Sequence, residues 1–167
     1  MQQGHEHHQS GGSSMDDAAK MQSHYKMLAL NLAISLAIMY FVMFAMINSL
    51  GEFIQNANFF YMALMMWAPM GSLMLLMMSG MYKNKRLNMA LHAIFVAVFV
   101  PSFLATRQQW LVGDKQFLRS MIPHHSGAIL MCRESTLKDA EIKRLCAEII
   151  PAQQREIDEM KQIMARM

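Results

Sequence analysis

The chain has 167 residues, of which 54% are hydrophobic and only 16% are charged, and its formal net charge is +3. A soluble domain is usually about a quarter charged, so this composition excludes an ordinary water-soluble protein over the whole length. The basic residues form no patch typical of nucleic-acid binding, and we expect no nucleic-acid partner. The 21 methionines supply flexible apolar side chains that are also soft ligands for copper or silver.

Residues 1–26 are polar and include a Gly-Gly-Ser-Ser run. This composition predicts a disordered tail. The tail contains His5, His7 and His8, which are candidate secondary metal contacts or simply loosely chelating side chains. The apolar run that follows is too long for a secretory signal and ends without a small-residue cleavage site.

Three apolar segments are long enough to cross a bilayer, which takes about 20 residues. They cover residues 27–50, 59–81 and 87–104, so we predict a transmembrane region over 27–104. The 51–58 loop has no Lys or Arg, whereas the 82–86 loop has Lys83, Lys85 and Arg86. The excess of positive charge on cytoplasmic loops predicts an N-terminus and a basic loop in the cytoplasm. In a bacterial inner membrane, residues 105–167 would then lie in the periplasm.

Methionines recur every four residues along the second apolar segment, at positions 62, 66, 70, 74 and 78. One interpretation is a ladder of soft ligands that passes metal through the membrane, with Met66, Met70 and Met74 as candidate secondary metal contacts. The other is that methionine simply packs in lipid. Periodicity alone does not distinguish the two, and we favour packing.

Residues 105–167 are predicted to form an antiparallel helical hairpin. The first helix runs from Asp114 to about residue 135 and the second from about residue 140 to the end, with a turn over 136–139. In such a hairpin, facing residues have numbers that sum to about 278, which places Cys132 opposite Cys146. We favour a disulfide, which suits an oxidising compartment. As free thiols, the two cysteines would instead join the soft-ligand set.

The first hairpin helix carries an unusual set of side chains within an arc of about 120°. The set consists of Asp114, Met121, His124, His125, Ala128, Met131 and Cys132. Imidazole, thioether and thiolate together favour copper, above all Cu(I). The same pairing brings Gln153, Glu156 and Met160 towards the histidines from the second helix. Core histidines and ordinary methionine packing explain any one of these residues, but the whole set favours a metal site.

The segments DKQFLRSMIPHHSGAILM and EIKRLCAEIIPAQQREIDEM resemble the bacterial family called domain of unknown function 305. The matching positions are Asp114, Phe117, Met121, His124, His125, Ala128, Met131, Gln153, Glu156, Ile157 and Met160. The resemblance covers about 50 residues and extends to a membrane-anchored subgroup with three spans. It implies a helical bundle and, for some periplasmic members, copper or silver binding through Met and His in metal resistance. Those members build a four-helix bundle from two hairpins, so a chain with one hairpin is expected to form a homodimer.

We therefore expect an all-α protein with three transmembrane helices followed by a helical hairpin, which is half of a ferritin-like four-helix bundle completed by dimerisation. The leading function is binding of copper, as Cu(I) or Cu(II), or of silver for metal tolerance or trafficking, with a metal-trafficking protein as a candidate partner. The expected primary ligands are His124, His125, Met121 and Met131, supplemented by Met160, Glu156, Asp114 and Gln153.

No catalytic constellation is present in the sequence, so we expect a binding protein and not an enzyme. Two alternatives stay open. One is a membrane accessory or dimerisation module with no metal role. The other is a small metal carrier lined by the methionines of the second span.

Overall fold

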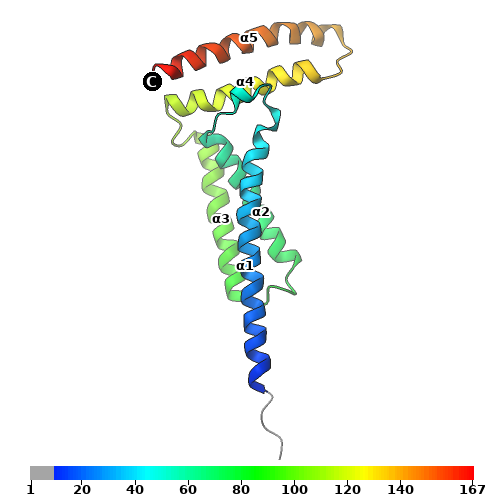
Figure 1. Ribbon diagram of the computed structural model, residues 1–167, viewed down its shortest axis with the longest axis vertical. Coiled ribbons are helices and arrows are strands. Elements are labelled where there is room, and N and C mark those ends of the chain that lie inside the picture. Colours follow the sequence, from blue (N-terminus) through cyan, green and yellow to red (C-terminus); the bar gives the residue numbers. More distant parts are fainter. Residues whose placement is uncertain (1–9) are drawn as a thin grey trace, which may run out of the picture.

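The computed structural model describes the backbone of residues 10–167 and the side chains from residue 19 onward. This part of the chain is helical throughout, without strands, which confirms the predicted all-α fold. Three long helices, α1 (Ser10–Val42), α2 (Ala57–Met77) and α3 (Lys85–Gln108), lie side by side (Figure 1). The helices α4 (Asp114–Glu134) and α5 (Ala140–Ala165) lie across one end of this bundle.

The three long helices contain segments that are long and apolar enough to cross a membrane, over Ala19–Met46, Ala57–Met77 and Lys85–Gln108. Their number and order agree with the three predicted spans. The first α-helix ends earlier than expected, at Val42, and continues as two short 3-10 helices, η1 (Met43–Met46) and η2 (Leu50–Glu52). Ser49 caps η2 in a reciprocal capping box with Glu52, which favours a new helical turn over continuation of α1.

The N-terminal end of α1 also differs from the sequence-based expectation. The helix begins at Ser10, so residues 10–26 are helical where a disordered tail was expected. Strong helix formers such as Ala18, Ala19 and Lys20 allow a helix that is fixed by its apolar half to extend in the N-terminal direction. The candidate metal contacts His5, His7 and His8 lie outside the described residues.

The core of the three-helix bundle is formed by Leu28, Leu32, Ala68, Leu75, Tyr82 and Phe95. Gly71 allows α2 and α3 to approach closely, because a Cβ atom at this position would lie 2.5 Å from Cζ of Phe95. The indole N–H of Trp67 donates a hydrogen bond of 2.7 Å to the carbonyl oxygen of Leu32 and ties α2 to α1. These contacts hold the three spans together as one unit.

The methionine row of α2 does not line a single path. Met66 is 45% exposed on the outside of the bundle, whereas Met74 packs against the bundle core. The Met65 sulfur lies 3.6 Å from the hydroxyl of Thr106, which donates to it from α3. A four-residue spacing drifts by about 40° per step, so the row winds around the helix, and its last member, Met78, is again 40% exposed. Such a spread is what packing would produce, and packing stays our prediction for these methionines.

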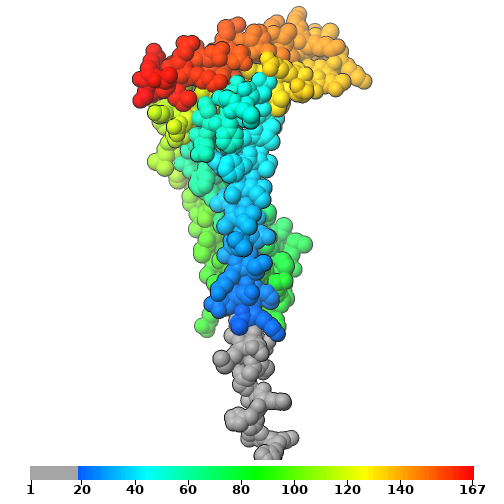
Figure 2. Space-filling view, in the orientation of Figure 1, coloured from blue at the N-terminus to red at the C-terminus, as the bar shows by residue number. Residues whose placement is uncertain are grey.

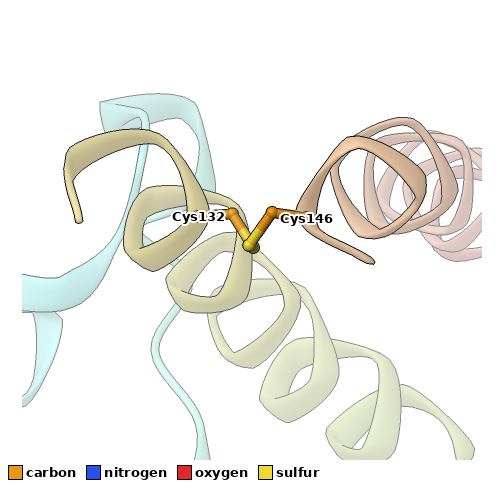
Figure 3. Close-up of a disulfide and its surroundings, with 2 residues drawn as sticks. All are labelled: Cys132 and Cys146. Carbon is orange, nitrogen blue, oxygen red and sulfur yellow. A yellow bond between two sulfur atoms is a disulfide. The ribbon is translucent and has the colours of Figure 1, made fainter. Parts of the chain in front are cut away.

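The hairpin of α4 and α5 has its own core, formed by Leu118, Ile122, Ile129, Ile157 and Met160. Asp139 caps α5 by accepting hydrogen bonds from the backbone N–H groups of Glu141 and Ile142. A disulfide joins Cys132 to Cys146 near the turn, which is the favoured of the two predicted states of these cysteines (Figure 3). The space-filling view shows that the hairpin is wider than the bundle below it and overhangs it on both sides (Figure 2).

Candidate metal-binding site on the hairpin

The helix α4 presents its chemically interesting side chains on two separate stripes. Met121, His125 and Cys132 point towards α5, where Met121 packs against the hairpin core, His125 is 8% exposed and Cys132 is in the disulfide. Phe117, His124 and Met131 follow one another at seven-residue steps and are all exposed. The single ligand face expected from the sequence is therefore divided, because two adjacent residues differ by about 100° around a helix.

His125 is held at both ring nitrogens. Nδ1 lies 2.9 Å from the carbonyl oxygen of Met121, and Nε2 lies 2.7 Å from Oε2 of Glu156 on α5. A carbonyl oxygen can only accept, so Nδ1 carries a proton and donates. The contact between Nε2 and the carboxylate then needs a proton between the two atoms. A metal ion could take the place of this proton only if the two side chains moved apart, since ligand bonds to nitrogen and oxygen are about 2.0–2.2 Å.

The backbone contact of His125 has a chemical consequence. Histidine ligands of metals commonly donate one ring N–H to a carbonyl oxygen, which fixes the ring and leaves the other nitrogen as the ligand. The Met121 carbonyl provides this arrangement for His125. The Glu156 side chain is 52% exposed and is therefore free to change rotamer. Nε2 of His125 and the carboxylate of Glu156 therefore face each other, as a nitrogen ligand and an oxygen ligand of one metal ion would.

The remaining predicted ligands lie at different depths. Met160 is buried in the hairpin core, and Met121 packs against the same core. Gln153 is half-buried on α5, and Asp114 is exposed at the first residue of α4, two helical turns before Met121. The structure therefore pairs His125 with Glu156 and places Met121 and Met160 at the hairpin core, whereas Asp114 lies apart at the start of α4.

The exposed stripe of α4 is extended by residues of α5. Cys132 and Cys146 face each other, so the residue that precedes each cysteine lies on the same side of the hairpin. These residues are Met131 and Leu145, which are 53% and 54% exposed. Phe117 and Ile142, at 52% and 47%, add to this side. We call Phe117, His124, Met131, Ile142 and Leu145 the open face of the hairpin.

In the described part of the chain, no three His, Cys, Asp or Glu side chains gather closely enough to hold a metal ion. The hairpin offers one imidazole in contact with one carboxylate, and two methionine thioethers at its core. The bonded cysteines are not available as thiolates. A soft ion such as Cu(I) or Ag(I) accepts thioether and imidazole ligands, so the residues present fit copper or silver if the methionines take part.

A buried polar cluster next to this site could not be recognised as such in the sequence. Glu52 in η2 is only 3% exposed, and its Oε2 accepts hydrogen bonds from the hydroxyl of Ser126 at 2.5 Å and from the backbone N–H of Ser49 at 3.1 Å. The Ser126 hydroxyl oxygen in turn accepts from the backbone N–H of Asn48 at 2.6 Å. The ammonium of Lys161 on α5 lies 4.0 Å from the Glu52 carboxylate. This cluster joins the hairpin to the loop between the first two spans.

A signal for this cluster does exist in the sequence. Glu52 is the only acidic residue between Asp17 and Asp114. An isolated carboxylate beside two transmembrane segments needs a partner, because burial of an unpaired charge is costly. The partner, however, is a serine 74 positions later, and no local pattern connects the two.

Comparison with known proteins places the chain in a family. The family model described as a domain of unknown function (DUF305) matches residues 77–164, which is more than half of the chain. The chain belongs to the DUF305 family. The DUF305 match begins at the last residue of α2, so it includes α3 as well as the hairpin, whose sequence carries the resemblance.

One curated protein is also similar to the chain. An uncharacterized protein of Acanthamoeba polyphaga mimivirus is 35% identical over 119 residues, a stretch that covers 70% of this chain and 76% of the relative. No solved structure gives a significant match.

Proposed function

We propose that this DUF305 protein is a membrane-anchored binding protein for a soft metal ion, copper or silver, in metal tolerance or trafficking. The observation that carries the proposal is the His125 ring, whose Nδ1 is held by the Met121 carbonyl while its Nε2 faces a carboxylate. The side chains of Met121 and Met160 lie at the core of the same hairpin. A bound ion would take His125 as its nitrogen ligand and the methionine sulfurs as its soft ligands, with Glu156 displaced or added as an oxygen ligand.

The open face extends the proposal to a homodimer. It carries four large apolar side chains in addition to His124, and a hairpin of two helices buries little surface by itself. Pairing of two hairpins along this face would complete a four-helix bundle. It would also bring His124 and Met131 of both copies to one interface. These predicted ligands would then bind metal only in the dimer. A metal-trafficking protein is the partner that such a site would serve.

The membrane orientation belongs to the same proposal. The hairpin lies at the end of the bundle that carries the 43–57 loop, and the basic loop with Lys83, Lys85 and Arg86 lies between the other ends of α2 and α3. Positive loops favour the cytoplasmic side, and disulfides persist in oxidising compartments. Both arguments support a hairpin on the outer side, which is the periplasm in a bacterial inner membrane, with the N-terminus in the cytoplasm.

The test uses the full chain in detergent with His5, His7 and His8 replaced by Ala, so that the tail does not contribute. Ag(I) is titrated against a competing chelator, because Ag(I) needs no reductant and leaves the disulfide intact. We expect His125→Ala and Met121→Leu each to weaken binding by about tenfold or more, the scale on which loss of ligand support lowers metal affinity.

Two matched variants control for the loss of a side chain elsewhere. His24→Ala removes an imidazole from α1, and Met89→Leu removes a thioether that is 70% exposed on α3. Both should bind Ag(I) as the parent does. If His124→Ala combined with His125→Ala leaves the affinity unchanged, the hairpin is not the site and the accessory or dimerisation module becomes the better description.

A further inference from the structure

A groove lies where the membrane-spanning bundle meets the hairpin, away from the candidate metal site. Its volume is about 640 Å³, within the roughly 300–1,000 Å³ that is usual for ligand pockets. Its lower wall consists of apolar side chains of α1 within the first span, together with Phe60 of α2. These residues are Ala33, Leu36, Ala37, Tyr40, Phe41 and Phe60.

The rim of the groove is polar. It is formed by Gln55, Asn56, Gln116 and Arg119. Two of these side chains are engaged within the protein, since Asn56 accepts from the backbone N–H of Phe59 at 2.9 Å and Gln116 accepts from that of Ala57 at 3.3 Å. In the described part of the chain, the carboxylates of Glu156 and Glu52 contact His125 and Lys161, respectively, and neither contacts Arg119. The guanidinium of Arg119 is thus a half-buried cation at the rim with no carboxylate partner among these residues.

This combination matches one kind of ligand. The apolar wall lies at the depth of a membrane-spanning segment, and the rim lies where that segment ends. An acyl chain fits an apolar wall within the hydrocarbon region, and a phosphate group lies at its boundary. Arginine is the residue best suited to phosphate, because its planar group can donate two parallel hydrogen bonds.

We propose that this groove binds an anionic phospholipid of the surrounding membrane, with its phosphate at Arg119 and an acyl chain along α1. The lipid fills the corner between α1, α2 and α4 and stabilises the hairpin in its position across the bundle. This site requires only that the protein lies in a membrane. It is independent of metal binding by the hairpin, so either proposal can fail without the other.

The test is lipid selection by the full chain in nanodiscs that contain equal amounts of phosphatidylglycerol and phosphatidylcholine. Lipids that remain bound after release from the nanodisc are counted by native mass spectrometry. We expect about fivefold enrichment of phosphatidylglycerol, which is what one basic residue near an anionic surface supplies. Arg119→Gln should lower the bound ratio to that of the mixture, whereas Lys115→Gln, an exposed cation one turn earlier that does not line the groove, should retain the enrichment.

A second pair of variants tests the apolar wall. Ala37→Trp fills the groove from α1, whereas Ile38→Trp changes the neighbouring residue, which is 57% exposed and outside the groove. We expect Ala37→Trp to lose the retained lipid and Ile38→Trp to keep it. Equal enrichment in Arg119→Gln and the parent, or equal retention in the two tryptophan variants, would overturn the proposal. Circular dichroism of each variant checks that the helices are intact.

Discussion

At the scale of single residues, the Glu52 carboxylate determines how the hairpin is attached to the membrane region. It is almost fully buried, and the Ser126 hydroxyl, the Ser49 amide and the Lys161 ammonium surround it. A buried carboxylate is tolerated only with such partners. Gly127 lies next to Ser126, and a Cβ at this position would be 3.4 Å from the carbonyl oxygen of Met46, so the loop packs closely on α4.

The Ser126→Ala variant tests this attachment. It removes the donor to Glu52 and the acceptor of the Asn48 N–H, so two buried groups lose a partner. We expect a loss of about 1–3 kcal/mol in the stability of the docked loop. Hydrogen exchange of residues 43–57 in the full chain measures this loss directly. Ser135→Ala, which alters an exposed serine at the end of α4, is the control and should leave the exchange unchanged. Equal exchange in the two variants would show that the cluster does not hold the loop.

At the scale of elements, the hairpin register agrees with what the sequence predicts. The disulfide joins the cysteines that the pairing rule places opposite each other. The pairing rule places Gln153 and Gln154 opposite the two histidines. In the structure His125 contacts Glu156, which is two or three residues further along α5. Such a shift is small, because neighbouring residues on one helical face are three or four positions apart. Short loops and amphipathic periodicity are local properties, and they are sufficient to define this hairpin.

The contribution of the disulfide to the stability of the hairpin can be tested. It closes a loop between two cysteines 14 positions apart, and cross-links that close loops of about 15 residues contribute about 3 kcal/mol in the chain-entropy model. We expect Cys132→Ser combined with Cys146→Ser to destabilise the hairpin by about 2–3 kcal/mol. Amide exchange of α4 and α5 in detergent is the measurement, and the parent protein treated with a reductant should behave in the same way. Unchanged protection in both samples would mean that helix packing alone holds the hairpin.

At the scale of the whole molecule, the open face is the surface on which the proposed dimer depends. One side of α4 carries Arg133, whose guanidinium donates to Asn48 in the loop, whereas the open face carries exposed apolar side chains. The open face lies on the flank of the hairpin, since the residues that dock on the loop are on a different side of α4. A second copy in the same membrane could therefore reach it.

The dimer is tested by Leu145→Asp in the full chain. Burial of a leucine is worth about 1.5–3 kcal/mol, so a charge at this position should weaken dimerisation by tenfold or more. Mass photometry over a dilution series in detergent gives the dissociation constant. Lys143→Asp, which changes the charge at an exposed α5 position outside the open face, should leave the dimer intact. A monomeric parent protein at all concentrations would contradict the paired bundle.

The sequence by itself determined the features that depend on local periodicity and composition. Three apolar runs specify three spans, because any segment in lipid must satisfy its own backbone hydrogen bonds as a helix. The hairpin and the pairing of its two cysteines follow from short-range spacing, and the structure joins them in a disulfide. Tertiary structure alone decided which of two adjacent histidines faces inward, since a helical pattern does not say how far the helix is rotated against its neighbour. Tertiary structure alone also paired Glu52 with Ser126 and placed Arg119 at the rim of a groove on α1. Contacts between such distant segments arise only when separate helices pack together.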